Sequence, residues 1–327
     1  MDNRLTKKRL SDFLAYEWIL TIVAAIAAII VLELIYTVAA TRLSVGQQFK
    51  YYTDEDLYVY DMSMGSIYDL LGVETGKNGK TFSFDVLSVE TENLTDSYNV
   101  LSVRLSVQEG DAIFTSSTEK EDGSVRAKSI IDEFPVYDMN KLLDGAKEYL
   151  TRFVRSGGDV YNPDDYDETK IRDWFDVRMK GDNRFRTEKE KEEGRKNEIG
   201  RIKKLAADTE DFETLLILGD AEGLFYRYTK YEQTATGVDD EVYRTAYERE
   251  KTDGRENCVY GFNMAAFTHA IDRTDKKNVS DYLKLAGGSA ENVVLILFDF
   301  SRYQPDLQYE CISFVCTLAR EFSDFLG

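Results

Sequence analysis

The chain has 327 residues, of which 31% are charged and 43% are hydrophobic, and this balance is typical of a globular protein rather than a disordered or fibrous one. Its 60 acidic and 41 basic residues give a net charge of -19, which repels phosphate backbones, so we expect no nucleic-acid partner. One histidine and three cysteines provide few side chains from which a zinc site or a histidine-based catalytic triad could be built. We therefore expect no metal and no cofactor.

A long apolar stretch near the N-terminus is the most specific feature of the sequence. It runs from Trp18 to Ala40 and contains one charged residue, Glu33. About 20 apolar residues in a helix cross a hydrocarbon core of roughly 30 Å. We therefore expect residues 17–41 to form a transmembrane helix, with Trp18 and Tyr36 near the two interfaces.

The basic residues around this stretch predict its orientation. Four bases lie in residues 1–16, whereas Arg42 is the only base shortly after the stretch. Because bases are enriched on the cytoplasmic side, residues 1–16 should be a cytoplasmic tail and residues 43–327 should be an extracytoplasmic body. The sequence thus predicts a single-pass protein of the cell membrane.

Two alternatives concern the same segment. Val38-Ala39-Ala40 also suits a signal peptidase, although the stretch is longer than the about 7–15 apolar residues of a typical signal peptide.

Inserting a carboxylate such as that of Glu33 into a bilayer costs a free energy of about 2.5–3.5 kcal/mol. It either snorkels or is protonated in the outer half of the helix, or it contacts a polar group on a partner transmembrane helix.

Strands and helices alternate after the apolar stretch. Their patterns predict strands over residues 49–60, 81–89 and 112–114 and helices over residues 67–73 and 98–108. The valines of the second helix also permit a strand. An order of β-α-β-α-β predicts an α/β fold in which helices cover a parallel sheet.

The middle of the chain has a largely helical pattern. Its predicted elements are four helices, over residues 132–155, 170–205, 212–218 and 241–250, and an acidic loop over residues 157–167. The mixed charges between Arg184 and Lys204 are typical of a solvated helix face rather than of a binding stripe.

The end of the chain returns to an α/β pattern. Strands are predicted over residues 258–263 and 293–298, the second buried on both faces, and an amphipathic helix is predicted over residues 312–326. A sheet that is interrupted and then resumed predicts two lobes. Lobe 1 would cover about 46–135 plus part of 255–327, and lobe 2 would cover about 136–255.

Two short segments carry a family resemblance. One is a helix that runs into Gly110-Asp111-Ala112-Ile113-Phe114, and the other is Val259-Tyr260-Gly261-Phe262-Asn263. With the alternating topology, they resemble the extracellular solute-binding proteins of ABC importers, which have the type 2 periplasmic-binding fold, here with a transmembrane helix in place of a lipid anchor. The resemblance implies two lobes that close on a ligand, and association with the permease subunits of an importer in a bacterial envelope.

Loops beyond the predicted strands supply the candidate ligand-binding residues. In open parallel sheets, ligands lie beyond the carboxyl ends of the strands. The candidates, whose side chains suit a neutral polar ligand such as a sugar or a peptide, are Asp61, Ser63, Ser66, Thr115, Ser116, Ser117, Tyr260, Asn263, Asp299 and Tyr303. The alternative for each is a turn residue that hydrogen-bonds its own backbone.

The cysteines, the histidine and an acidic loop are expected to be structural. Cys311 and Cys316 are five residues apart on a predicted helix, which splays them too far for an easy disulfide, so buried free thiols are expected. A bridge from Cys258 to one of them is the alternative. His269 is expected to be a structural hydrogen-bonding residue, and the acids within 159–168 lack the spacing of an EF-hand.

We predict a membrane-anchored, extracytoplasmic, solute-binding-like protein without enzymatic activity. The sequence contains no Walker loop, no G-x-S-x-G and no H-E-x-x-H motif. The first alternative is a ligand-free interaction subunit that docks on a membrane complex through Glu33 and the acidic surface. The second is a carboxylate-based glycan hydrolase, for which no pair of acids stands out in the sequence.

Overall fold

The chain forms two compact units, Met1–Ser44 and Val45–Gly327. The computed structural model describes residues 7, 11, 18–41, 48–54, 57–59, 88–94, 97–107, 109–182, 185–237, 241–268, 283–285, 290–299, 309–323 and 325–326. The predicted helix over residues 67–73, most of the predicted strand over residues 81–89, and His269 lie outside these described residues.

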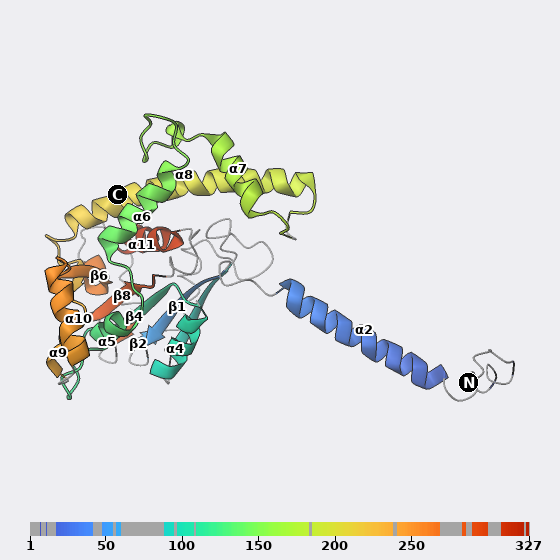
Figure 1. Cartoon of the computed structure of the whole chain (residues 1–327), viewed down its shortest axis with the longest axis horizontal. Coiled ribbons are helices and arrows are strands. Elements are labelled where there is room, and N and C mark those ends of the chain that lie inside the picture. Colours follow the sequence, from blue (N-terminus) through green and yellow to red (C-terminus); the bar gives the residue numbers. More distant parts are fainter. Residues whose placement is uncertain are drawn as a thin grey trace. The chain divides into compact units, whose positions relative to one another are not determined.

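The first unit contains helix α2, which spans Trp18–Thr41 (Figure 1). The sequence prediction of a helix over residues 17–41 is confirmed at the level of secondary structure. Its described apolar side chains are exposed, including the consecutive residues Ile29 to Leu32, which at about 100° per residue point to all sides of the helix. No helix within the described residues combines the length and the apolar character needed to pass through a membrane.

The second unit is built on a mixed sheet of six strands in the order β3-β1-β4-β8-β6-β5, so the predicted α/β class is confirmed. Its strands are β1 (Gln48–Asp54), β3 (Ser88–Leu94), β4 (Ala112–Ser116), β5 (Phe225–Tyr228), β6 (Cys258–Asn263) and β8 (Val293–Leu297). Strands β2 (Leu57–Val59) and β7 (Leu283–Leu285) form a separate antiparallel pair.

Strand direction divides the six-stranded sheet into two parts. β1 is parallel to both of its neighbours, with Phe49 opposite Val89 and Tyr52 opposite Ile113. β8 is antiparallel to β4 and to β6, and β5 is antiparallel to β6. The prediction of a parallel sheet is thus right for β3, β1 and β4 but wrong for β8, because the chain enters β8 from the end of the sheet at which β4 leaves it.

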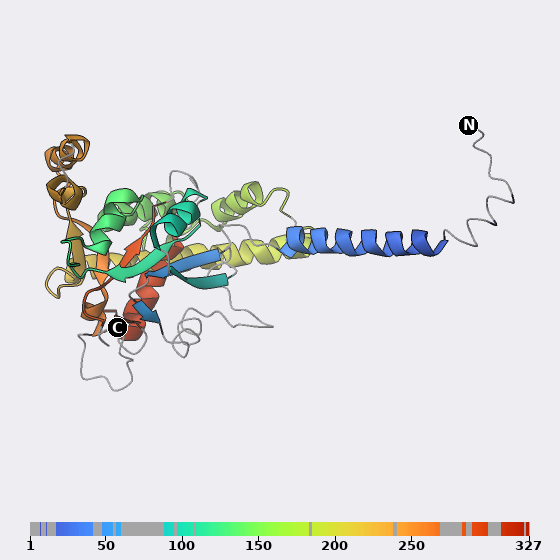
Figure 2. The ribbon, with the colours of Figure 1, turned by 90° about the horizontal axis from the view of Figure 1, so that it is seen from below.

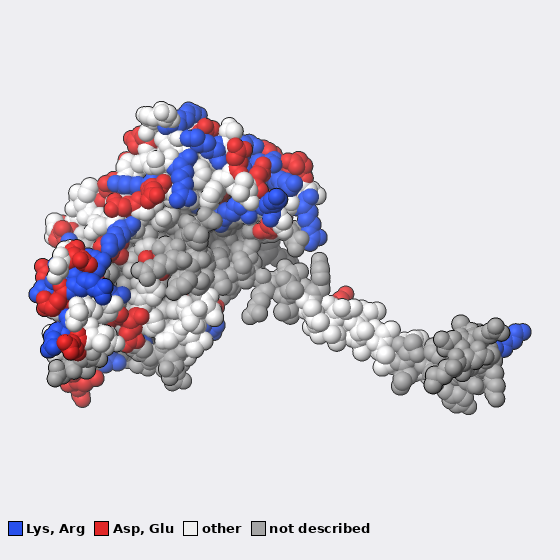
Figure 3. Space-filling view, viewed as in Figure 1, with Lys and Arg blue, Asp and Glu red and all other residues white. Residues whose placement is uncertain are grey.

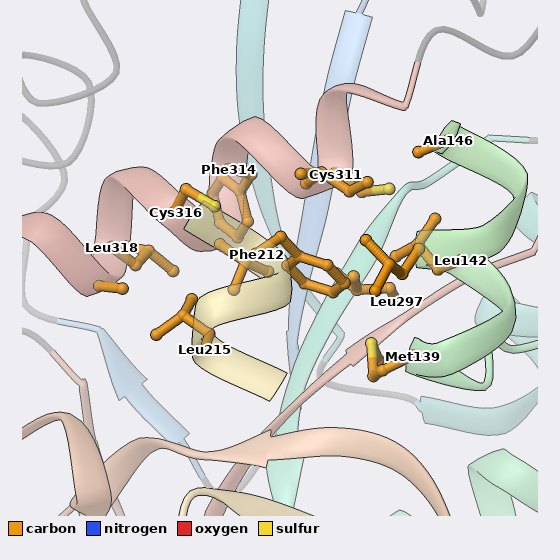
Figure 4. Packing of buried hydrophobic residues seen from close by; sticks show 14 of the residues in the cluster. Met139, Leu142, Ala146, Phe212, Leu215, Leu297, Cys311, Phe314, Cys316 and Leu318 are labelled. Atoms are coloured by element: carbon orange, nitrogen blue, oxygen red, sulfur yellow. The ribbon is translucent and has the colours of Figure 1, made fainter. Parts of the chain in front are cut away.

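Three helices cover one face of the sheet (Figure 1). They are α6 (Met139–Thr151), α8 (Glu188–Leu218) and α11 (Glu310–Phe322), and they bury alternate strand residues such as Tyr51, Phe114 and Leu295. Figure 4 shows Phe212 of α8 between α6 and α11. Because each fully buried large apolar side chain contributes about 1.5–3 kcal/mol, this cluster is the main core of the unit.

Two shorter helices cover the other face. Residues of α4 (Ser97–Ser106) and α5 (Arg126–Glu133) pack on the opposite set of strand residues, which includes Tyr52, Ile113 and Ile296. Helices α9 (Glu232–Gly237) and α10 (Glu241–Thr252) lie together at one end of the unit (Figure 2). The buried carboxyl group of Asp132 joins α5 to this end, since it accepts hydrogen bonds from Tyr228, Tyr231 and Thr234.

Two predicted helices are each broken in the structure. The predicted helix over residues 132–155 is interrupted after α5, because Pro135 disfavours helical geometry in the residue before it. The predicted helix over residues 170–205 is divided into α7 (Glu168–Arg178) and α8, with Gly181 at φ +88° between them. Thr187 and Glu190 form a capping box that starts α8, which then continues through the predicted helix over residues 212–218.

The charged surface of α8 is solvated over its first turns, as predicted. Figure 3 shows Lys and Arg side chains intermixed with Asp and Glu over α7 and α8. Arg195 pairs with both carboxylate oxygens of Asp176 at 2.8 and 2.9 Å. Farther along α8 three charged residues are buried, Glu198 at 1% exposure, Arg201 at 7% and Asp208 at 1%. The prediction of a solvated face between Arg184 and Lys204 is therefore wrong for Glu198 and Arg201.

Both buried acids are paired. Arg201 donates to the two oxygens of Glu198 at 2.9 and 2.7 Å, and also to the Tyr149 hydroxyl at 2.9 Å. Asp208 accepts hydrogen bonds from Ser313 and Arg320. Because Ser313 and Arg320 belong to α11, these pairs fix α8 against α11.

Residues 45–327 form a single unit in the structure. The structure does not show the two lobes that the sequence predicts over residues 46–135 with part of 255–327, and over residues 136–255. The helical middle instead packs directly on the six-stranded sheet, since Leu142, Ile202 and Phe212 belong to the same buried cluster as the strand residues.

Candidate functional site

A pocket of about 420 Å³ opens at the end of the sheet where β8 finishes. We call it the tyrosine pocket, because tyrosines and charged residues dominate its lining: Val136, Tyr137, Asp138, Lys141, Gly145, Lys230, Tyr231, Glu250, Arg255, Tyr260, Asp299 and Tyr309. Pockets of about 300–1,000 Å³ are typical of small-molecule sites.

The segment after Pro135 forms one wall of the tyrosine pocket. The Tyr137 N–H donates to the Leu297 carbonyl at 2.9 Å, and the Asp299 N–H donates to the Pro135 carbonyl at 2.9 Å. Asp138 then caps α6 by accepting a hydrogen bond from the Asn140 N–H at 3.1 Å. This short bridge to β8 places Tyr137 beside the sheet rather than on a helix.

Tyr309 and Tyr231 reach the tyrosine pocket through unusual backbone geometry. Tyr309 precedes α11 with φ +60°, and Tyr231 follows β5 with φ +69°. Bulky residues rarely adopt a left-handed conformation, and such positions cluster at functional sites. Gly145 of α6 leaves room for Tyr309, because a Cβ atom there would lie 3.0 Å from the Tyr309 hydroxyl oxygen.

Tyr137 carries the clearest chemical signal in the tyrosine pocket. Its side chain is only 5% exposed, and its hydroxyl has no hydrogen-bond partner among the described residues. Burial raises the pKa of this phenol, and nearby Cys311, Asp299, Tyr309 and Asp111 raise the pKa further. Tyr137 therefore stays protonated, with one donor and two lone pairs available.

The basic residues differ in how far they are already engaged. Arg255 donates to Glu250 at 2.9 Å and to Asp253 at 2.9 Å. The Lys230 ammonium lies 3.3 Å from the Phe134 carbonyl oxygen and 5.4 Å from the centre of the Tyr231 ring. Lys141 is exposed and makes no hydrogen bond or ion pair within the described part of the chain.

Asp111 lies next to this end of the sheet, just before β4. Its carboxylate accepts a hydrogen bond from the Lys50 N–H at 2.8 Å, and its carbonyl accepts from the Phe298 N–H at 3.0 Å. Burial raises the pKa of Asp111 to about 7, and the Glu310 carboxylate adds to this rise, while Lys50 opposes it. The carboxyl group is thus partly protonated at neutral pH.

The sequence-predicted site residues separate into two groups. Tyr260 and Asp299 line the tyrosine pocket. Thr115, Ser116, Ser117 and Asn263 lie at the opposite end of the sheet, because Thr115 and Asn263 both pair with Val294 near the start of β8. Asp61, Ser63, Ser66 and Tyr303 lie outside the described residues. Glu33 is exposed on α2.

Three residues of the second group bond to the chain's own backbone. The Ser117 hydroxyl donates to the Asn292 carbonyl at 3.2 Å, and the Ser116 hydroxyl accepts from the Thr118 N–H at 3.0 Å. The Asn263 amide donates to the Gly223 and Phe225 carbonyls at 2.9 Å each. Ser116 thus has the local hydrogen bond of the turn-residue alternative, whereas Ser117 and Asn263 bond backbone carbonyls of segments distant in the sequence.

The remaining candidates have structural surroundings. All three cysteines are free; Cys311 and Cys316 are buried, as predicted, and Cys258 is half-buried. In the acidic loop, Asp159 and Asp165 accept hydrogen bonds from the loop's own N–H groups, and Asp167 caps α7. A second pocket, of about 530 Å³, lies between α7 and α8, where Arg195 is already paired with Asp176 and Glu188.

Sequence reasoning missed Tyr137, Tyr231 and Tyr309. One signal was available. Pro135 is followed closely by Asp138, a residue type that caps helices, and this pattern predicts a helix that starts after Tyr137.

In comparisons of the chain with protein-family models, curated proteins and solved structures, nothing matches.

Proposed function

We propose that the second unit is a non-enzymatic binding domain that holds a small polar ligand in the tyrosine pocket. The supporting observation is the buried Tyr137 hydroxyl, which has no hydrogen-bond partner among the described residues. Burying a hydroxyl without a partner costs about 1–3 kcal/mol, and a polar group of a ligand would remove that cost. Tyr260 and Asp299, both predicted from the sequence, line the same pocket.

We further propose that α2 anchors this domain to a membrane, with residues 43–327 on the extracytoplasmic side. The absence of a membrane-crossing helix concerns only described residues, and the side chains at positions 20–21 and 36–41 of α2 are not among them. The apolar stretch over residues 18–40 has a single charge, and its described side chains are exposed on all sides. Such a surface requires lipid or a protein partner.

Association with the permease subunits of an ABC importer is a separate proposal. It rests on the sequence resemblance alone. The ligand-free interaction subunit remains the alternative if the tyrosine pocket takes no ligand.

The proposal is tested by a thermal-shift screen of the full chain in detergent against sugars, amino acids and short peptides. A ligand at about 100 times its dissociation constant stabilises by about 2.7 kcal/mol, which should raise the Tm by roughly 5 °C. The same screen on Tyr137→Phe should give a smaller shift. Tyr166→Phe is the matched control, because Tyr166 is 1% exposed and its hydroxyl donates to the Val160 carbonyl at 2.6 Å, outside the pocket. No shift across the panel would favour the interaction subunit.

A further inference from the structure

The pocket of about 530 Å³ between α7 and α8 shares no lining residue with the tyrosine pocket. We call it the hairpin pocket, because its lining comes from the two packed helices and from the loop that joins them. Its volume lies within the range of about 300–1,000 Å³ that is typical of small-molecule sites. Four basic and two acidic residues line it: Lys180, Arg186, Lys191, Arg195, Asp176 and Asp182.

Local contacts fix the loop that forms the hairpin pocket. The Asp182 N–H donates to the Met179 carbonyl at 3.0 Å, and the Phe185 N–H donates to the Asp182 carbonyl at 3.2 Å. The Phe185 ring packs on Phe175 of α7, with ring centroids 5.0 Å apart. Gly194 of α8 leaves room for both rings, because a Cβ atom there would lie 2.4 Å from Phe175 Cζ and 2.8 Å from Phe185 Cε1. The pocket is therefore preformed, and the half-buried Met179 and Phe185 give it an apolar wall.

Several acids around the hairpin pocket already have partners. Both oxygens of Asp176 accept hydrogen bonds from Arg195, at 2.8 and 2.9 Å, and Arg195 also donates to Glu188 at 2.8 Å. Glu190 accepts two backbone N–H groups at the start of α8, at 3.0 and 2.7 Å. Arg195 is thus engaged with the chain's own acids, so a ligand would have to use the other bases of the lining.

Three of these bases keep donors for a ligand. The side chains of Lys180 and Arg186 are exposed and make no hydrogen bond or ion pair within the described part of the chain. The Lys191 ammonium lies 3.9 Å from Glu188, which is beyond hydrogen-bond distance. Two of the three bases come from the loop and one comes from the first turn of α8, yet all three line the same pocket.

The hairpin belongs to a basic segment of an acidic chain. Residues 170–204 contain 13 basic and eight acidic residues, a net charge of +5, whereas the rest of the chain contains 28 basic and 52 acidic residues, a net charge of -24. Charges farther away than about 8 Å are largely screened at physiological ionic strength. An anion at the hairpin pocket therefore interacts with the local excess of bases more than with the distant acids.

We propose that the hairpin pocket binds a phosphate monoester group, held by Lys180, Arg186 and Lys191, with the organic part of the same molecule against Met179 and Phe185. A phosphate monoester carries a charge of about -1.5 to -2 at neutral pH and about three acceptor oxygens, so it can accept hydrogen bonds from all three side chains. A carboxylate has a single charge and two oxygens. The planar guanidinium also suits bidentate binding of phosphate.

This inference concerns a second site and does not depend on the proposed function of the tyrosine pocket. The test is calorimetric titration of the full chain in non-ionic detergent at about 0.15 M NaCl. The probes are phenyl phosphate, glycerol 3-phosphate, benzoate and dihexanoyl phosphatidic acid. We expect phenyl phosphate to bind about tenfold more tightly than benzoate, which keeps the ring but has less charge. It should also bind more tightly than glycerol 3-phosphate, which lacks the ring.

Phosphatidic acid separates two sources of the phosphate group. Its binding in the absence of binding by both soluble phosphates would identify a lipid headgroup as the ligand. Binding of phenyl phosphate would identify a soluble phosphorylated molecule. Binding of none of the three phosphate probes would overturn the inference and would leave the proposal for the tyrosine pocket intact.

Variants locate the binding site. Lys180→Gln and Arg186→Gln should each weaken phenyl phosphate binding about fivefold, the upper end for an exposed ion pair. Lys196→Gln is the matched control, because Lys196 is exposed on α8 and lies outside the lining. Lys141→Gln in the tyrosine pocket should also leave the affinity unchanged. Benzoate binding as tight as that of phenyl phosphate, or an affinity that neither Lys180→Gln nor Arg186→Gln lowers, would overturn the assignment.

Discussion

The two ends of the six-stranded sheet satisfy their polar groups in different ways. At the end where β4 finishes, Ser117 and Asn263 donate hydrogen bonds to backbone carbonyls of neighbouring segments. At the end where β8 finishes, the Tyr137 hydroxyl is buried without a partner among the described residues, and a pocket lies beside it. Both ends carry the residue types that the sequence singles out, so residue type alone does not distinguish an end whose polar groups are satisfied internally from an end with an open pocket.

The largest expected effect tests the buried ion pair between Glu198 and Arg201 of α8. Replacing Arg201 by Ala leaves Glu198, which is 1% exposed, as an unpaired buried carboxylate. Burial acts to raise the pKa of Glu198, but Arg201 together with Arg178 outweighs this effect and lowers the pKa. Breaking one partner of such a pair costs about 3–5 kcal/mol, so urea unfolding should show a loss of that size.

The matched control for Arg201→Ala is the double variant Glu198→Met with Arg201→Met. It removes both charges while keeping similar side-chain volumes. We expect it to recover most of the lost free energy of unfolding. A double variant as unstable as Arg201→Ala would show that packing, and not the unpaired charge, causes the loss.

The next effect is a pH dependence of the free energy of unfolding, caused by Asp111 at the end of the sheet that carries the tyrosine pocket. Its folded-state pKa is about 7, whereas an unfolded aspartate has a pKa near 3.9. Between these values the folded state keeps a proton that the unfolded chain releases, so this contribution to stability is present below about pH 4 and is lost as the pH rises to about 7. Because Asp111 is partly exposed, we expect the free energy of unfolding to fall by about 2 kcal/mol, which is less than the full energy equivalent of the pKa difference between the two states.

The measurement for Asp111 is urea unfolding of the natural chain and of Asp111→Asn between pH 4 and 8. Other carboxylates titrate in both proteins, so only the difference between the two free energies of unfolding reports on Asp111. That difference should change with pH in favour of the variant as the pH rises. A constant difference would mean that the Asp111 carboxyl group is ordinary.

The variant Asn263→Ala tests the end of the sheet where β4 finishes, which is the end opposite the tyrosine pocket. The variant loses two side-chain hydrogen bonds, to the Gly223 and Phe225 carbonyls, and should lose about 1–2 kcal/mol of stability. Ligand binding should be unchanged, because Asn263 lies at the opposite end of the sheet from the tyrosine pocket. A weaker ligand affinity with little change in stability would reverse the assignment of the two ends.

Local sequence patterns predict several elements well. β8 is a continuous apolar run that is buried throughout, and α11 follows its amphipathic periodicity. The direction of β8 could not be predicted, since the side chains of a strand buried on both faces do not record the direction of its neighbours. β5 was missed because its four residues are too few to establish an alternating pattern.

The candidate site is harder to predict because its residues come from separate segments. Tyr260 and Asp299 follow from their positions next to strands, and both line the tyrosine pocket. Tyr137 does not follow from the sequence pattern once residues 132–155 are assigned to one helix. Its importance depends on the absence of a hydrogen-bond partner for its hydroxyl among the described residues, which only the folded arrangement shows.

The last variant should change the free energy of unfolding least, and it tests most directly whether the tyrosine pocket is a binding site. Tyr137→Phe removes a hydroxyl that has no partner among the described residues, so without ligand the free energy of unfolding should stay within about 0.5 kcal/mol or rise slightly. Tyr166→Phe removes a hydroxyl that donates to the Val160 carbonyl at 2.6 Å, so it should lose about 1 kcal/mol. With ligand present the order reverses, because only Tyr137→Phe then loses a hydrogen bond to the ligand. Equal losses for the two variants in the absence of ligand would mean that the protein itself already satisfies Tyr137, and the tyrosine pocket would lose its main support as a binding site.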